Sequence, residues 1–171
     1  MGVATHAGHW ENQVTTSAQL RLATPADVDA LFAIRTSVTE NALTREQLAD
    51  LGITPETFAA AVAAEPCAWV MEVADAVVGF SLVDLSAGEV FALFVRPEWQ
   101  GRGFGARLLA AAETALFRRH ALIWLVTDGT AAVRANVLYR ARGWQQVAQL
   151  EGKDVRYEKQ RGVERSADDI A

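Results

Sequence analysis

The chain has 171 residues, the size of one α/β domain with a sizeable core. Its 51% apolar and 22% charged residues are typical of a globular protein, and its net charge of −5 argues against nucleic-acid binding, which would require a basic face. No apolar run reaches the roughly 18 residues that a membrane span requires. The N-terminus lacks the apolar segment of a secretory signal, and the single cysteine, Cys67, fits a reducing compartment, so we expect a cytoplasmic protein.

The elements expected along the chain follow from apolar periodicity, capping residues and turn residues. The first half predicts a strand at 19–23, helices at 24–38, 44–51 and 56–64, and a hairpin of strands at 69–74 and 77–85 that turns at Asp75-Ala76. The second half predicts a strand at 89–95, a helix at 103–119, a strand at 122–127, a helix at 130–142, and a closing hairpin of 144–150 with 155–159. This order predicts an α/β fold in which helices cover both faces of a mixed sheet.

One domain is expected at 18–160, between flexible polar tails at 1–17 and 161–171. His6 and His9 lie in the first tail, but no further ligands cluster near them, so we expect no metal site. His120 ends a helix, where a cation suits the helix dipole, and needs no catalytic explanation.

Three glycines at alternate positions (Gly101, Gly103 and Gly105) lie between an apolar strand that stops at Arg96-Pro97 and the start of a helix. Glycine lets the backbone turn sharply and approach a ligand closely. The first N–H groups of the helix have no partner within the helix and lie at the positive end of its dipole. The sequence therefore predicts a site for a phosphate or pyrophosphate.

Two motifs together resemble one family. The loop Gln100-Gly101-Arg102-Gly103-Phe104-Gly105 matches a Q/R-x-x-G-x-G/A motif at every defined position, and Tyr139, Gly143 and Trp144 form a Tyr-x-x-x-Gly-aromatic ending. Over about residues 19–160 the chain resembles the GNAT superfamily of acetyl-coenzyme A-dependent N-acetyltransferases. The resemblance implies a mostly antiparallel sheet of about seven strands. It also implies transfer of an acetyl group from acetyl-CoA to a primary amine by direct attack in a ternary complex, without a metal.

The resemblance also implies which residues bind the coenzyme. The family's splayed strand corresponds here to Leu93, Phe94 and Val95, and its pyrophosphate loop runs from Gln100 through Gly101, Arg102, Gly103, Phe104 and Gly105 to Ala106. Asn136 and Tyr139 complete the set. Many members carry Asn where this chain has Ala132, so Asn136 is assigned to the coenzyme arm by proximity alone. Arg102 and Arg107 could pair with coenzyme phosphates or be solvated surface charges.

Two side chains are candidates for proton transfer. Glu89 starts the strand before the loop, where apolar neighbours would raise its pKa and suit a general base, although a solvated acid after a turn fits equally well. Tyr139 could protonate the leaving thiolate, or be a core aromatic beside Val133 and Leu138. Cys67 opens an apolar strand with no histidine near it in sequence, which indicates a buried, inert thiol.

The amine acceptor is the least defined partner. In the family it meets the segment after the first helix, which assigns Arg35, Glu40 and Asn41 to substrate binding, although a solvated loop explains them equally well. A small-molecule amine is expected, with no nucleic-acid or membrane partner. The sequence does not separate a metabolite, an antibiotic, a polyamine or a protein N-terminus, and a homodimer remains open.

Two other functions compete with this one. Gly101-x-Gly103-x-x-Ala106 also fits a Rossmann dinucleotide loop, with Asp128 as the ribose-binding acid. Several residues separate the strand from the first glycine, however, and the loop follows several strands instead of opening the fold. The other alternative is a protein of the same fold that binds an acyl-CoA only as a sensor.

Overall fold

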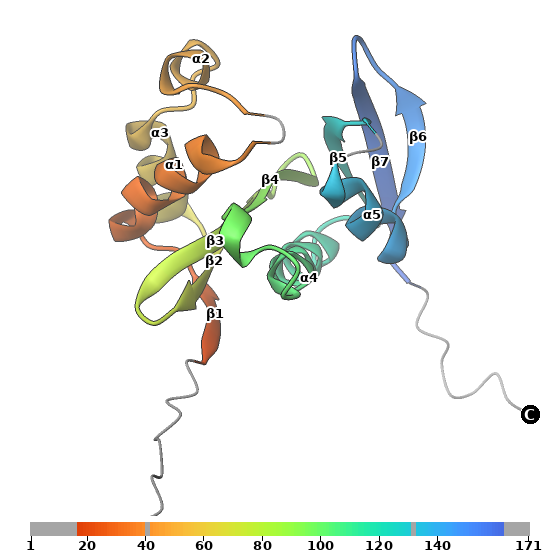
Figure 1. The fold of residues 1–171 in the computed structure, drawn as a ribbon. Coiled ribbons are helices and arrows are strands. Elements are labelled where there is room, and N and C mark those ends of the chain that lie inside the picture. The colour runs from red at the N-terminus through yellow and green to blue at the C-terminus, as the bar shows by residue number, and fades with distance from the viewer. Residues whose placement is uncertain (1–16, 40–41, 131–132, 163–171) are drawn as a thin grey trace, which may run out of the picture.

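Seven strands form one mixed, mostly antiparallel sheet in the computed structural model, which describes residues 17–39, 42–130 and 133–162 (Figure 1). In chain order they are β1 (Ala18–Leu22), β2 (Ala68–Val73), β3 (Ala76–Asp84), β4 (Glu89–Val95), β5 (Leu122–Asp128), β6 (Gln145–Gln149) and β7 (Asp154–Gln160). They lie in the order β1-β2-β3-β4-β5-β7-β6, and β4 with β5 is the parallel pair among them. The predicted fold class is confirmed. A Rossmann fold is excluded, because its sheet would be mainly parallel.

Helices cover both faces of the sheet (Figure 1). On one face, the short helix η1 (Pro25–Asp27) leads into α1 (Val28–Ser37), followed by α2 (Arg45–Asp50) and α3 (Pro55–Ala64). On the other face, α4 (Phe104–Phe117) packs across β2 to β5 and is joined by α5 (Arg134–Ala141). Leu31, Phe32 and Ile34 of α1 and Leu109 and Leu116 of α4 belong to one buried core, which excludes water from both faces.

Most expected boundaries differ from the observed ones by one or two residues, and two differences have a clear local cause. The β2–β3 turn is Ala74-Asp75, one residue earlier than predicted, with φ of +50° and +63°, because Ala76 already pairs with Val73. Helix α5 starts at Arg134 and not at residue 130, since the Asp128 carboxylate accepts a hydrogen bond from the Thr130 backbone N–H over 2.8 Å and forms a turn there. Within the predicted tails, His6 and His9 lie outside the described residues.

The feature that positions the site is a split between β4 and β5. These parallel strands share one register pair, Glu89 with Trp124, and diverge beyond it (Figure 1). Along its other edge β4 remains paired with β3, although the register steps over Phe91, from Val90 to Ala92, in a β-bulge. The sheet is therefore open at its centre, next to the N-terminus of α4.

Candidate functional site

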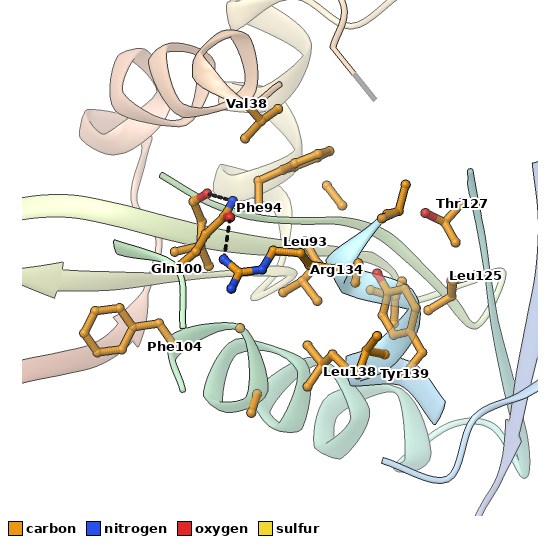
Figure 2. Close-up of a pocket in the computed structure, with 18 of the residues that line it drawn as sticks. Val38, Leu93, Phe94, Gln100, Phe104, Leu125, Thr127, Arg134, Leu138 and Tyr139 are labelled. Carbon is orange, nitrogen blue, oxygen red and sulfur yellow. Dashed lines mark hydrogen bonds between the residues drawn. The ribbon is translucent and has the colours of Figure 1, made fainter. Parts of the chain in front are cut away.

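A cavity of about 490 Å³ lies in the split between β4 and β5. Its walls come from both strands, the glycine loop and α5, and most of the side chains that line it are apolar (Figure 2). The lining residues are Val38, 90–95, Trp99, Gln100, Gly101, 103–106, 125–127, 133–135 and 137–139. A mainly apolar cleft with a few convergent polar groups is the usual form of a small-molecule site.

The glycine loop forms one end of this cavity. Gly101 and Gly103 have φ of +76° and +82°, and Gly103 is the N-cap of α4. A Cβ at Gly103 would have no protein atom within 4 Å, so the loop leaves open space where the helix begins. The first intrahelical bond runs from Arg107 N–H to the Gly103 carbonyl, which leaves the preceding N–H groups without a helical acceptor. The geometry fits an anionic group such as a pyrophosphate.

Gln100 spans the mouth of the cavity. Its side-chain amide donates to the Val95 carbonyl over 3.1 Å and accepts from the Arg134 guanidinium over 3.3 Å (Figure 2). Arg134 also lies 3.9 Å from where a Gly101 Cβ would be, which places a cation beside the glycine loop. Arg134 was not singled out from the sequence, because its approach to Gln100, 34 residues away, depends on how the chain folds.

The other loop arginines do not line the cavity. The Arg102 guanidinium lies 4.5 Å from the centre of the Trp99 ring, and Arg107 reaches the Ala18 carbonyl at 3.5 Å. Their contact with coenzyme phosphates stays a prediction.

Tyr139 lies at the inner wall, between α5 and β5, and its side chain is buried (Figure 2). Its ring packs against Trp144 and Tyr157, with centroids 6.0 and 5.6 Å away. Burial, and next the neighbouring Tyr157, raise the pKa of the Tyr139 phenol above its usual range. The phenol is therefore neutral and carries a proton to donate, and the structure brings it together with Leu93, Phe94 and the loop.

Glu89 lies outside the cavity lining, at the closed end of the split where β4 and β5 still pair. Burial raises the pKa of its carboxyl, as does the nearby Asp84 to a smaller degree, while Arg156 acts in the opposite direction. From this position a base would reach an acceptor amine through water. Its role as the general base stays a prediction.

Asn136 does not line the cavity. It is buried, and its side-chain N–H groups donate to the carbonyls of Asp128 and Thr130 over 2.9 and 3.1 Å. The amide thereby holds the end of β5 against α5, and this use of its donors gives no support to a coenzyme contact.

Of the three predicted acceptor-binding residues, the structure describes Arg35. Arg35 lies behind the cavity wall, with its guanidinium 4.5 Å from the centre of the Phe94 ring, and burial lowers its pKa. Glu40 and Asn41 lie outside the described residues. The structure instead brings Val38, from the same predicted acceptor segment, to the cavity, together with Phe91 and Val126.

Other candidate chemistry is not supported. Within 17–39, 42–130 and 133–162, no group of three or more His, Cys, Asp or Glu residues could hold a metal ion. Cys67 is buried, and burial raises the pKa of its thiol, which suppresses the reactive thiolate. No helix in the described part of the chain has the length and apolarity to span a membrane.

Comparison with known proteins agrees with this geometry. Residues 64–146 match the family model described as acetyltransferase (GNAT) domain. Among curated proteins, no sequence matches the chain significantly.

Solved structures match over most of the chain. The PaiA N-acetyltransferase from Thermoplasma acidophilum, in complex with coenzyme A, has a TM-score of 0.69 at 16% identity, over 85% of this chain and 99% of that one. The yncA protein of Salmonella typhimurium, with its cofactor acetyl-CoA, has a TM-score of 0.64 at 19% identity, over 84% and 94%. A ribosomal-protein-alanine N-acetyltransferase from Brucella melitensis has a TM-score of 0.61 at 23% identity, over 83% and 99%.

Proposed function

The chain belongs to the GNAT acetyltransferases, and we propose that it transfers an acetyl group from acetyl-CoA to a primary amine by direct attack within a ternary complex. The observation that carries the proposal is the continuity of two features: the glycine loop at the start of α4 opens directly into the cavity between β4 and β5. A phosphate-binding end and a channel through the sheet, joined in this way, fit a long ligand with a phosphorylated head. Two of the similar structures were solved with coenzyme A or acetyl-CoA, which supports this choice of donor.

The residues present fit such a ligand. The N–H groups at the start of α4 and the Arg134 guanidinium would bind the pyrophosphate, and the apolar side chains of Leu93, Phe104 and Leu138 would line the path of the arm. Beyond Glu89, the edge of β4 that faces the split has no strand beside it in the register of the sheet. Its backbone groups can therefore bind the arm and donate to the carbonyl oxygen as negative charge develops there.

When bound, acetyl-CoA supplies an electrophilic thioester carbonyl. The acceptor nitrogen forms a bond to that carbon, the carbon–sulfur bond breaks, and one proton must leave the nitrogen while one reaches the sulfur. Tyr139 is the residue that we assign to the sulfur, since its neutral phenol lines the cavity. Glu89, through water, is our candidate for taking the proton from nitrogen, and its raised pKa brings its basicity closer to neutrality.

The experiment that tests this function is an acceptor screen. Purified full-length protein is incubated with acetyl-CoA and a broad panel of primary amines, and free thiol release is measured alongside mass spectrometry of the acetylated amine. We expect at least one amine to be acetylated with equal release of thiol. Coenzyme binding in calorimetry without turnover of any amine would favour the acyl-CoA sensor instead.

A further inference from the structure

The cavity passes through the sheet and so has two differently built ends. Leu93 pairs with Ser81, whose hydroxyl donates to the Leu108 carbonyl of α4, so Leu93 faces the α4 side with the glycine loop. The Arg35 guanidinium of α1 lies over the ring of Phe94, so the Phe94 side chain faces the α1 side of the sheet. Figure 2 shows Val38 and Phe94 on the α1 side of β4, and Phe104 and Leu138 on the α4 side. If the phosphates lie at the glycine loop, the α1 end is left for the acceptor.

The acceptor end is built from apolar side chains. Val38, directly after α1, lines the cavity together with Phe94 of β4 and Val126 of β5. Phe91 also lines the cavity, at the β-bulge of β4, and is 46% exposed. A β-bulge beside a site re-aims a side chain, which makes Phe91 a candidate to contact the acceptor.

The charges of the described cavity wall disfavour one class of acceptor. Among the described lining residues there is no carboxylate, and the ionisable side chains are the cation Arg134 and the phenol of Tyr139. A second ammonium group on the acceptor would lose its hydration in this cavity without gaining an anionic partner from the described wall. Glu89, the nearby acid, lies outside the lining.

From these features we infer that the acceptor is a primary amine on an apolar, aromatic or aliphatic body without a second positive charge, and that Phe91 and Val126 contact this body. The inference rests on the proposed acetyl transfer. Apolar walls also favour the neutral form of the entering amine, which is the form that can attack the thioester. The apolar end thereby contributes to both binding and deprotonation.

Two acceptors of equal length test the inference. 1-Aminohexane and 1,5-diaminopentane have the same number of non-hydrogen atoms and differ in carrying a methyl or a second ammonium group at the far end. With the full-length protein and saturating acetyl-CoA, we expect kcat/KM to favour 1-aminohexane by about 10- to 100-fold. The diamine carries two equivalent amino groups, which by itself would raise its kcat/KM about twofold, so a preference for 1-aminohexane would not come from the number of reactive groups.

Matched variants assign the preference to the cavity. Phe91→Asp should reduce the ratio of the two kcat/KM values by about 10-fold or more, since it adds a carboxylate at the acceptor end. Val147→Asp makes the same kind of change at a 50% exposed bulge position of β6, outside the cavity lining, and should leave the ratio unchanged. Equal or better turnover of the diamine by the wild type would overturn the inference and leave acetyl transfer standing. Turnover of neither amine, while a polar or polycationic amine is acetylated, would overturn it equally.

Discussion

The indole N–H of Trp144 donates a hydrogen bond to the Glu113 carboxylate over 2.8 Å, in the interior between α4 and the start of β6. The other carboxylate oxygen accepts from the Lys159 ammonium over 2.9 Å. One acid thereby holds both strands of the closing hairpin region against α4. Since the Trp144 ring packs on Tyr139, this network also supports the inner wall of the cavity. The Gly-aromatic ending of the sequence motif thus has a structural reason.

Replacing Glu113 should destabilise the protein. Glu113→Ala leaves the buried indole N–H and the Lys159 ammonium without their acceptor, and we expect a loss of about 3 kcal/mol in the free energy of unfolding. Glu113→Gln keeps an oxygen that can accept from Trp144 and should cost about 1 kcal/mol. Urea unfolding followed by tryptophan fluorescence measures both. Equal losses for the two variants would mean that the charge, and not the indole hydrogen bond, dominates.

Gly103 should be required for coenzyme binding. Gly103→Val puts a branched side chain at a φ of +82° and at the open face of the loop, so we expect acetyl-CoA binding to be lost in calorimetry. Gly52→Val is the matched control, because Gly52 also has a positive φ of +75° and open surroundings but lies outside the cavity lining. The control carries the same kind of backbone strain and should retain binding. Tight NADH binding by the wild type, without binding of acetyl-CoA, would contradict the proposed donor.

Tyr139→Phe separates catalysis from binding. The variant keeps the ring that packs on Trp144 and Tyr157 and removes only the phenolic hydroxyl. If the phenol protonates the leaving thiolate, kcat should fall by about 100-fold or more, while affinity for acetyl-CoA barely changes. Steady-state kinetics and calorimetry together give the two values. A fall in affinity with kcat preserved would assign Tyr139 to coenzyme binding, and no change in either would make it a core aromatic.

The role of Glu89 can be tested through pH. A carboxyl accepts a proton only above its pKa, and burial raises the pKa of Glu89, so its basic form is lost at a higher pH than for an exposed glutamate. Glu89→Gln should lower kcat most visibly below pH 8, where loss of the proton from the amine is hardest. The difference should disappear again once the pH falls through the raised pKa of Glu89, because the wild type then loses its base as well. Glu56→Gln, an exposed acid in the first turn of α3, should leave the pH profile unchanged. An identical profile for Glu89→Gln would leave water as the base.

The sequence by itself determined the elements and the phosphate-binding loop. Alternating apolar residues, threonine caps such as Thr54 and the glycines around Gly103 act through neighbours a few residues away, so their signals are local. This is why β4 was predicted at its observed bounds and why α4 was placed within two residues at its C-terminal end. The expected phosphate site followed from the same local chemistry of a helix N-terminus, whereas acetyl-CoA as the donor followed from the family resemblance of the motifs.

Only the tertiary structure decided what surrounds that loop. The split between β4 and β5, the approach of Arg134 to Gln100 and the placement of Glu89 at the closed end depend on strand register and helix packing. The amide of Asn136 was similarly committed to backbone carbonyls that folding brings beside it. The Gln100–Arg134 and β4–β5 contacts join segments far apart in the chain. Their geometry is set by the packing of the whole core rather than by the periodicity of any one segment.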